Sequence, residues 1–562
     1  MKTSASKPLG RRSFIKSLGV GTAALSTGAA LPLSGCTATP ATPAAAQNDE
    51  PVLQVGENIA VADTDCGKVK GFLMRGINTF LGIPYGADTT GKNRFMPPVK
   101  HEPWEGVRPA VFYGNSAPQN IYDRSPTSYG AFIDHWNYDE VSENCLTLNV
   151  WTPGLADGGK RPVIVWLHGG GYTSGNGIEQ DGYHGESLSR YGNIVFCSIN
   201  HRLGVFGFSD LSAVGGDKYK DSGSVGLLDM VAALRWINGN IANFGGDPGN
   251  VTIIGQSGGG GKVCLLSSCP AANGLFHKAV PLSGSAISAN PKQYSQALGE
   301  YILKEAGLGK NEVDKLQNLP WSDYLAIANR AAAKMREERG DSGMRRGGFG
   351  PVGDDTYLPS GTFFESPLPG SPDVPMLFCT TFHEQSPSRT NAQLEEITLD
   401  GVKEYLRERF GENTDAIVQA YAGNFPDSKP IEILCFILSS RQNVVNAANA
   451  KLKQKSPVYM AWFGWCAPLF DGRMRAFHCS DISFWFYNTD LMLTHSGGGS
   501  RPRTLSKKMA DALLAFARTG DPNCDSLPAW PQFTAANGET MILNDVCEVK
   551  NDPDKAGRSA VV

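Results

Sequence analysis

Short, almost continuous apolar runs recur along the chain and predict buried strands. The runs are residues 163–167, 194–196, 251–254, 376–378 and 458–463. A strand that is wet on one face alternates apolar and polar residues, whereas these runs have few polar positions. Strands buried on both faces are typical of parallel sheets that helices cover on each side. The pattern therefore predicts a large, mostly parallel sheet.

Helical patterns separate these runs. Residues 226–244 have apolar positions three or four apart, which predicts a helix with one buried stripe. The stripe consists of Leu227, Val231, Leu234, Ile237 and Ile241. The sequence G-G-D-P at 245–248 is a strong stop signal for this helix. The alternation of strands and helices predicts one doubly wound α/β domain over residues 52–562, without an internal repeat or a low-complexity linker.

Residues 285–349 follow a different pattern, which is mainly helical. Residues 322–339 predict a long helix that Gly340 ends, and a Gly/Arg-rich loop follows at 343–350. The segment lies between two stretches that carry candidate chemistry, so it could pack over a site as a cap. A peripheral helical insertion explains the same pattern, and the sequence leaves both interpretations open.

The composition is that of a globular protein, with 41% hydrophobic and 19% charged residues in a chain of 562. Residues 1–36 hold five of the 51 basic residues and none of the 55 acidic ones. Without them the formal net charge falls from −4 to −9. This mildly acidic body argues against nucleic acid as the main partner.

The first 51 residues predict export. The sequence G-R-R-S-F-I-K at 10–16 resembles a twin-arginine signal, and the apolar stretch after it is too short and too weakly apolar for a membrane span. L-S-G-C at 33–36 resembles a bacterial lipoprotein box, which makes an acylated Cys36 the mature N-terminus; a plain cleaved signal is the alternative. Residues 37–51, rich in Ala, Thr and Pro, form a tether. The expected location is the periplasmic face of a membrane through Cys36, or soluble in the periplasm or medium.

The remaining eleven cysteines are scattered and lack paired C-x-x-C spacing, which argues against a zinc site. Cys197 lies within an apolar run and is interpreted as a buried core thiol. The sequence assigns no disulfide pairs.

The sequence G-Q-S-G-G at 255–259 directly follows the predicted strand 251–254 and centres on Ser257. In a G-x-S-x-G motif, a sharp turn from strand to helix exposes the serine Oγ, and only small neighbours avoid a clash. The helix that follows points its N-terminal N–H groups toward the site. A Gly-rich phosphate loop is the alternative, but the lysine and spacing of a P-loop are missing. Ser257 is therefore the candidate nucleophile.

A second glycine-rich stretch, H-G-G-G-Y at 168–172, follows the predicted strand 163–167. Ester cleavage develops negative charge on the carbonyl oxygen, and glycines let backbone N–H groups approach that oxygen closely. Gly170, Gly171 and the amide of Gly258 together predict an oxyanion hole with three donors. A flexible turn is the alternative interpretation, and the position directly after a buried strand favours the oxyanion hole.

Together with further motifs, these stretches make the chain resemble the type-B carboxylesterase (cholinesterase-like) family of α/β hydrolases. The further motifs are F-L-G-I-P-Y-G at 80–86, S-E-N-C-L-T-L-N-V-W at 142–151, N-I-A-N-F-G-G-D-P at 240–248, F-A-R-T-G-D-P-N at 516–523 and W-P at 530–531. The resemblance extends over roughly residues 52–550. It implies the α/β-hydrolase fold with helical cap-like insertions, and ester hydrolysis that needs no metal or organic cofactor.

The resemblance also assigns an acid and a base, in the chain order Ser, acid, His of α/β hydrolases. Glu384, which follows the predicted strand 376–378, takes the position of the family's acid, although a glutamate at a strand end can also be a solvated surface charge. His478 follows the run 458–463 and takes the position of the base. The other histidines after Ser257 are interpreted as structural or exposed, namely His277, His383 and His495.

Four positions depart from the family's pattern. Gln256 stands where the family usually has Glu, which disfavours a cationic substrate, and Gly258 replaces the usual Ala, which keeps the donor and loosens the turn. Cys145 matches a family cysteine whose usual partner position holds Ala117, so we expect Cys145 to be free. Pro281 cannot donate a ladder hydrogen bond, so the strand around it should be short or distorted.

The sequence therefore predicts a serine carboxylic-ester hydrolase that forms an acyl-serine intermediate on small to medium alkyl or aryl esters. An amidase or carbamate hydrolase could use the same residues, but it must protonate a poorer leaving group. A non-catalytic binding protein is a third reading, because adhesion members of this fold have lost the triad; here all three positions are filled. The sequence identifies neither the physiological ester nor the oligomeric state.

Overall fold

The structure is a computed structural model that describes residues 51–120, 140–339, 348–439 and 441–561. The predicted signal at 1–36, with the predicted acylation site Cys36, and all but the last residue of the predicted tether at 37–51 lie outside these residues, as does Gly340. None of the helices within the described ranges combines the length and the apolar character that a membrane crossing needs.

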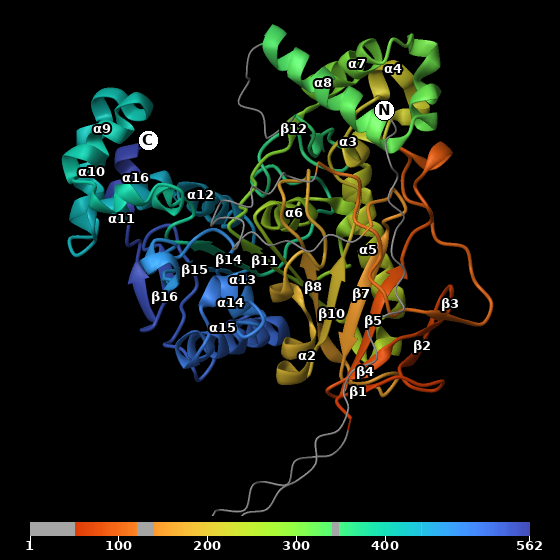
Figure 1. The fold of residues 1–562 in the computed structure, drawn as a ribbon, viewed down its shortest axis with the longest axis horizontal. Coiled ribbons are helices and arrows are strands. Elements are labelled where there is room, and N and C mark those ends of the chain that lie inside the picture. The colour runs from red at the N-terminus through yellow and green to blue at the C-terminus, as the bar shows by residue number, and fades with distance from the viewer. Residues whose placement is uncertain (1–50, 121–139, 340–347, 440, 562) are drawn as a thin grey trace, which may run out of the picture. The chain divides into compact units, whose positions relative to one another are not determined.

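Twelve strands of the described chain form one sheet (Figure 1). In spatial order they are β1 (Leu53–Gln54), β4 (Phe72–Met74), β5 (Ile77–Pro84), β7 (Thr147–Thr152), β9 (Val195–Ile199), β8 (Arg161–Leu167), β10 (Gly246–Gln256), β11 (Lys278–Leu282), β14 (Met376–Thr381), β15 (Val458–Phe463), β16 (Glu539–Leu543) and β17 (Glu548–Asn551). The strands from β9 to β16 pair in parallel, and the pairs at both edges are antiparallel. The predicted mostly parallel sheet is confirmed.

Successive side chains of the central strands enter two different cores, because residues alternate between the faces of a sheet. On β8, Val163, Val165 and Leu167 lie in one core, and Ile164 and Trp166 lie in the other. Helices α5 (Val225–Asn240), α6 (Gly258–Leu266) and α12 (Gln442–Lys451) contribute to the first core. Helices α2 (Glu186–Gly192), α13 (Ile482–Trp485) and α15 (Ser500–Thr519) contribute to the second. Both faces of the sheet are therefore dry, as the apolar runs predict.

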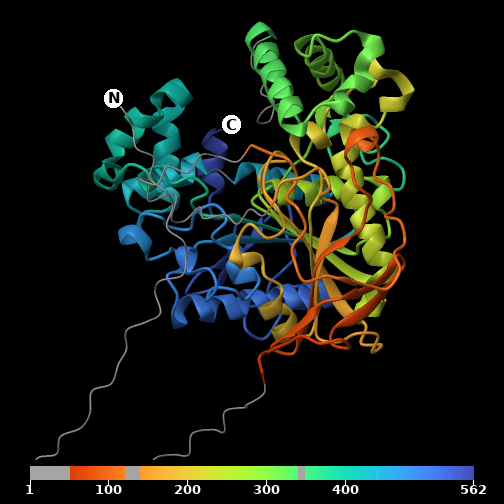
Figure 2. The same cartoon turned by 45° about the vertical axis from the view of Figure 1, so that its right-hand side comes forward.

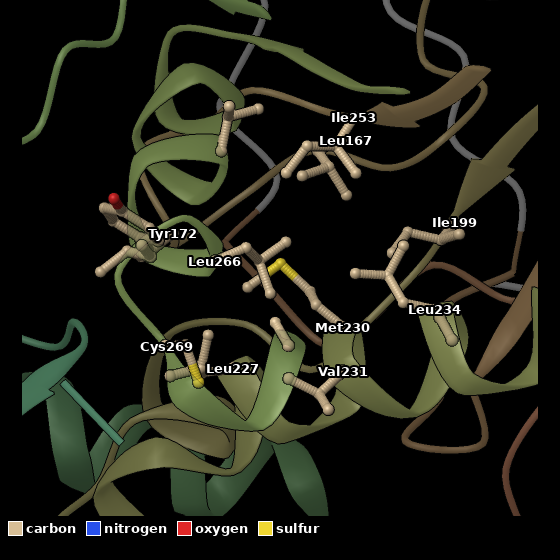
Figure 3. Close-up of a cluster of buried hydrophobic side chains, with 14 of the residues drawn as sticks. Leu167, Tyr172, Ile199, Leu227, Met230, Val231, Leu234, Ile253, Leu266 and Cys269 are labelled. Atoms are coloured by element: carbon tan, nitrogen blue, oxygen red, sulfur yellow. The ribbon is translucent and has the colours of Figure 1, made fainter. Parts of the chain in front are cut away.

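The first core holds α5 and α6 against the strands. Figure 3 shows Leu167 of β8 and Ile253 of β10 near Leu266 of α6, with Met230 and Leu234 of α5 on the far side. The predicted helix 226–244 is α5 followed by a 3-10 turn (Ile241–Phe244). Gly245 ends it with a φ of 70°, a left-handed conformation that glycine adopts without steric cost.

Pro281 interrupts the sheet on one side only. β11 pairs with β10 without a break from Lys278 to Leu282. Toward β14, Ala279 N donates to the Pro375 carbonyl (3.1 Å) and Ser283 N donates to the Cys379 carbonyl (2.7 Å). Proline 281 lies midway between these donors and has no N–H, so the ladder lacks one hydrogen bond there. The strand is short, as predicted, and it is distorted only in its pairing with β14.

The helical insertion consists of α7 (Lys292–Glu305), a 3-10 helix (Lys310–Asn318) and α8 (Trp321–Arg339), which confirms the predicted helix at 322–339. α7 and α8 pack against each other (Figure 1), α7 contacts α4 (Ser212–Gly215), and α8 contacts α3 (Gly204–Gly207). The Tyr324 ring of α8 lies 5.5 Å from the Phe206 ring of α3. Gly204 N in turn donates to the Tyr172 carbonyl (2.7 Å). The insertion is thus connected through α3 to the glycine-rich stretch at 168–172.

A third group of helices covers one edge of the sheet near the C-terminus. It consists of α9 (Leu399–Phe410), α10 (Thr414–Asn424), α11 (Pro430–Leu438) and α16 (Lys555–Val561), drawn in teal and dark blue in Figure 2. These helices share a core with Trp462 of β15 and Ile542 of β16. The described strands and α-helices are completed by two small sheets and one helix. The sheets are β2 (Val61–Thr64) with β3 (Gly67–Lys70) and β6 (Val107–Pro109), and β12 (Asn290–Pro291) with β13 (Val352–Gly353); the helix is α14 (Leu493–Ser496).

All eleven cysteines within the described residues are free thiols. Cys145 is among them, as expected from Ala117 at its partner's position, and Cys197 is buried in β9. Burial raises the pKa of both thiols, so both remain neutral.

A buried ion pair joins the end of β9 to α5. Arg202 and Asp229 are almost fully buried, and the guanidinium donates to both carboxylate oxygens, from Nε at 2.8 Å and Nη2 at 2.7 Å. Removal of the carboxylate leaves a buried cation without a partner. We expect Asp229→Ala to lower the free energy of unfolding by about 3–5 kcal/mol, measured by urea denaturation. Asp400→Ala, which removes an exposed pair with Lys403, is the control and should leave the midpoint almost unchanged. Equal midpoints for the two variants would contradict this.

Candidate active site

Ser257 lies in a sharp turn between β10 and α6. β10 ends at Gln256, α6 begins at Gly258, and Ser257 has φ 58° and ψ −122°, which a residue with a side chain rarely adopts. Two hydrogen bonds hold this backbone: Ser257 N donates to the Leu282 carbonyl (2.8 Å), and Gly261 N donates to the Ser257 carbonyl (3.0 Å). The predicted strand–turn–helix geometry around Ser257 is confirmed.

The glycine-rich loop after β8 lies against this turn. Gly170 and Gly171 have φ of 87° and 61°, and the N–H groups of Gly170, Gly171 and Gly258 have no hydrogen-bond acceptor among the described residues. A Cβ added to Gly258 would lie 2.4 Å from Gly171 N, so the two backbones are in direct contact. Gly258 therefore does more than loosen the turn, because it lets the loop approach the start of α6. The three predicted donors are adjacent to Ser257 and available.

Glu384 and His478 form the central contact of the site. One carboxylate oxygen of Glu384, Oε2, bonds to His478 Nδ1. The other, Oε1, accepts hydrogen bonds from Ser283 Oγ (2.6 Å), Thr380 Oγ1 (2.5 Å) and the Thr381 backbone N–H (2.7 Å). All four contacts fix the carboxylate just past the end of β14. With Nδ1 engaged, His478 Nε2 remains for chemistry.

These contacts determine the charges of the pair. Burial raises the pKa of Glu384, but His478 and the hydroxyls of Ser283 and Thr380 lower it, and the result is about 2. Glu384 is therefore ionised at neutral pH. Burial lowers the pKa of His478, whereas Cys479 and the Glu384 carboxylate raise it, and the net direction is well above 6.5. Because the thiol of Cys479 is neutral at neutral pH, the direction depends on the Glu384 carboxylate.

Gln256 connects the strand before the candidate nucleophile to the candidate base, His478. Its Nε2 lies 3.3 Å from each ring nitrogen of His478, a position over the ring rather than in its plane. Its Oε1 accepts a hydrogen bond from Cys479 Sγ (3.1 Å). The amide at the position where the family usually has Glu therefore touches the imidazole directly, and it does so without a charge.

The structure brings Ser257 into the same cluster as Glu384 and His478, through its neighbours. Gln256 contacts His478, and Ser283, which follows β11 beside Ser257, contacts Glu384. Within the described residues, Ser257 Oγ is not hydrogen-bonded to His478. In enzymes without substrate the bond from nucleophile to base is often long, and it tightens in the complex. His478 is 38% exposed, so substrate can reach it.

Sequence reasoning missed several residues around this pair. Ser283 and Thr380 are polar residues at the carboxyl ends of buried strands, which is a weak signal in one sequence. Asp481 is fully buried three residues after His478, and one of its oxygens, Oδ2, accepts from Trp485 Nε1 (3.2 Å). Burial, together with the negative charge of Glu384, raises the pKa of Asp481 to about 7.

The remaining histidines after Ser257 are structural, as predicted. His277 Nδ1 accepts from Val251 N, and His383 Nδ1 accepts from Ala476 N. His495 is buried against the Phe477 ring, at 5.0 Å between centroids.

Comparison with known proteins agrees with this geometry. The model of the carboxylesterase family matches residues 58–558. The chain belongs to the carboxylesterase family. It has the family's α/β-hydrolase fold and is a serine carboxylesterase.

Its relatives include enzymes with different substrates. The carboxylesterase is 32% identical to a phenmedipham hydrolase of Pseudarthrobacter oxydans, with 86% of this chain and 95% of the relative covered. It is 31% identical to a para-nitrobenzyl esterase of Bacillus subtilis (89% and 97% covered). Among solved structures, an esterase of Clostridium hathewayi that can hydrolyse aliphatic aromatic polyesters matches with a TM-score of 0.76 and 34% identity (90% and 98% covered).

The Glu384–His478 contact predicts a pH dependence. A general base must be neutral, so kcat/KM of this carboxylesterase should rise with pH through the pKa of His478, which lies above 6.5. Glu384→Gln removes the carboxylate, so the rise should move to lower pH, and kcat should fall about 10³–10⁴-fold because the imidazole loses its orientation. Glu305→Gln, in an ion pair on α7, should leave the profile unchanged. An acid limb at the same pH in Glu384→Gln and wild type would contradict the assignment.

The contact between Gly258 and Gly171 predicts the effect of a methyl group. In Gly258→Ala the new Cβ must push the loop away from α6, because it would lie 2.4 Å from Gly171 N. We expect kcat to fall about 10–100-fold from misaligned oxyanion donors, with KM little changed. Gly239→Ala is the control, because Gly239 is an exposed position of α5 and a Cβ there would meet no atom within 4 Å. It should stabilise the fold by about 0.5–1 kcal/mol without an effect on kcat. Full activity of Gly258→Ala would show that the contact between Gly258 and Gly171 does not hold the oxyanion donors in place.

Proposed function

We propose that the chain hydrolyses small to medium alkyl or aryl esters through an acyl-enzyme at Ser257. The observation that carries this proposal is the Glu384–His478 pair beside the strained turn of Ser257. A carboxylate that fixes Nδ1 leaves Nε2 as the atom that can take a proton from a neighbouring hydroxyl. Ser257 is the nucleophile, His478 the base and Glu384 the residue that orients the base.

In the first half of the reaction, His478 Nε2 takes the Ser257 proton while Oγ attacks the ester carbonyl carbon. The carbonyl oxygen gains negative charge, which the N–H groups of Gly170, Gly171 and Gly258 stabilise. The imidazolium then protonates the leaving alcohol, and an acyl-serine remains.

In the second half, His478 takes a proton from water, and the hydroxide oxygen attacks the acyl-serine. A second oxyanion forms at the same three donors and collapses, and His478 returns the proton to Ser257 Oγ. Glu384 stays ionised throughout, since its pKa of about 2 lies far below neutral pH. The products are a carboxylic acid and the free enzyme.

The neutral amide of Gln256 indicates the charge of the substrate. It occupies the surface beside Ser257 and His478 and brings no negative charge there. The other carboxylate of the site, Glu384, is already bonded to His478 and three other donors. An uncharged ester is therefore favoured over a cationic one. The two relatives named for a nitrobenzyl ester and for aromatic polyesters support aryl groups in the substrate.

Carbamate hydrolysis is a second candidate. A phenmedipham hydrolase, which is a carbamate hydrolase, is among the relatives. The same nucleophile and base would form a carbamoyl-serine. Turnover of matched ester, carbamate and amide substrates that share one aryl group separates this activity from ester hydrolysis. A non-catalytic binding role is disfavoured, because Ser257, Glu384 and His478 are all present and clustered.

We further propose that residues 1–36 direct export and that Cys36 is acylated, so that the tether at 37–51 holds the enzyme at the periplasmic face of a membrane. The twin arginines at 11–12 and the L-S-G-C sequence at 33–36 support this. Palmitate labelling of wild type and Cys36→Ala in cells tests it, and equal labelling of the two would refute acylation at Cys36.

A fluorophosphonate probe and a panel of p-nitrophenyl esters test the central proposal. Wild type should label at Ser257 and hydrolyse short-chain esters. Ser257→Ala should lose the label and about 10⁵–10⁶-fold of kcat, because the nucleophile is gone. Ser267→Ala is the matched control, since Ser267 is a buried serine just past the end of α6 whose hydroxyl bonds locally to the Val263 carbonyl. Unlabelled but folded wild-type protein would exclude the acyl-serine mechanism.

A further inference from the structure

A buried lysine lies under the oxyanion loop, defined here as residues 168–171. Lys262 is on α6, five residues after Ser257, and its side chain has no exposed surface. Its ammonium group donates a hydrogen bond to the His168 carbonyl at 2.8 Å. His168 is the residue between the end of β8 and Gly169, so the bond joins the nucleophile's helix to the base of the loop.

The backbone around this bond is packed as tightly as glycine allows. A Cβ added to Gly259, in the first turn of α6, would lie 2.0 Å from the Leu167 carbonyl oxygen and 2.9 Å from that of His168. A Cβ on Gly169 would lie 3.5 Å from Ser257 Cβ. The His168 carbonyl therefore faces α6, and the loop that it begins lies directly against Ser257. This carbonyl shares its peptide plane with the Gly169 N–H, so its rotation would turn the first peptide of the loop and shift the backbone that leads to Gly170 and Gly171.

The buried carboxyl group of Glu179, whose pKa burial raises to about 7, is the acidic group that acts on Lys262. Glu179 is buried, accepts from Tyr183 Oη (2.8 Å) and interacts electrostatically with Lys262. Burial lowers the pKa of Lys262 to about 7, and Glu179 opposes this shift. Two buried imidazoles, His168 and His201, stack nearby at 5.2 Å between centroids, and burial keeps both neutral.

A lysine at such a buried position lowers the free energy of unfolding, because its amine loses its contact with water. A methionine or leucine would fill a comparable volume in the core without the desolvation of an amine and a carboxylate. The mechanism does not use Lys262 for proton transfer, since His478 and Glu384 supply the base. What Lys262 contributes and an apolar residue does not is a donor directed at the His168 carbonyl.

We propose that Lys262 is a positioning residue for the oxyanion hole: by holding the His168 carbonyl, it sets the direction of the Gly170 and Gly171 N–H groups relative to Ser257. The proposal rests on the acyl-serine mechanism of the preceding section. Helix α6 then has two roles. Its N-terminal end supplies the Gly258 donor, and Lys262 in its second turn holds the loop that carries the Gly170 and Gly171 donors.

The test uses Lys262→Met, which keeps the length of the side chain and removes the donor and the charge. We expect kcat on a p-nitrophenyl ester to fall about 10–100-fold with KM within about threefold, because the donors act mainly on the transition state. An aryl trifluoromethyl ketone gives a second readout. Ser257 Oγ adds to its carbonyl carbon, the proton passes to His478, and the resulting oxyanion occupies the hole. The affinity of Lys262→Met for this ketone should fall by the same factor as its kcat/KM.

Lys451→Met is the matched control. Lys451 is equally buried, at the end of α12, and bonds to Asp373 Oδ1 (2.7 Å) on a part of the fold without contact to the loop. Its removal should lower the melting temperature and leave kcat and ketone affinity within twofold of wild type. Assays are run well below the melting temperatures of both variants. Labelling of wild type by the fluorophosphonate probe first tests the acyl-serine mechanism on its own.

Two results would overturn the proposal. If Lys262→Met loses stability but keeps kcat within twofold, as Lys451→Met does, the lysine is only part of the core. If kcat falls while ketone affinity is retained, the lysine acts elsewhere than on the oxyanion donors. Should Lys262→Met not fold, Lys262→Leu, which also lacks a donor, is judged by the same two criteria.

Discussion

The strained backbone of Ser257 is the constraint on which the rest of the site depends. A residue with φ 58° between a strand and a helix is held only because its neighbours leave it no alternative. β10 fixes the approach through its pairing with β8 and β11, and α6 fixes the exit through its packing on the first core. Three other parts of the site lie around this turn. They are the oxyanion loop, the neutral amide of Gln256 and Ser283, which bonds to Glu384. The glycines at 258 and 259 are the steric condition for this crowding, because each faces the backbone of residues 167–171.

Electrostatics complete what packing begins. Glu384 makes four contacts. Three neutral donors bond to Oε1 and stabilise the ionised carboxylate, and Oε2 bonds to His478 Nδ1, where its negative charge stabilises the protonated imidazole. Two neighbours carry no charge at neutral pH, because Gln256 is an amide and the Cys479 thiol is neutral. Burial raises the pKa of Asp481 to about 7, so this carboxyl group is only partly ionised near neutral pH. The carboxylate in direct contact with the imidazole is that of Glu384, and it stabilises the imidazolium that exists transiently in the reaction.

The sequence was sufficient for the parts of this molecule that depend on local pattern. The apolar runs located β8, β10, β14 and β15, the turn motif located the strained serine, and the family resemblance located Glu384 and His478. What it could not provide were contacts between residues far apart in the chain. Gln256 and His478 are separated by 222 positions, and Ser283 and Glu384 by 101. A lone lysine in a glycine-rich helix also gives no sign that it is buried or that it bonds to the carbonyl of His168. Such pairs become visible only when the sheet places two strand ends side by side.

The ladder hydrogen bond that Pro281 cannot make would join β11 to β14, and parts of the candidate site lie on either side of this pairing. Ser257, the oxyanion loop and Lys262 belong to the part of the sheet on the β10 side, whereas Glu384 and His478 follow β14 and β15 on the other side. The side chain of Ser283 crosses between the two sides to reach Glu384. The spacing of the Ser257 hydroxyl and the His478 imidazole therefore depends on how β11 pairs with β14.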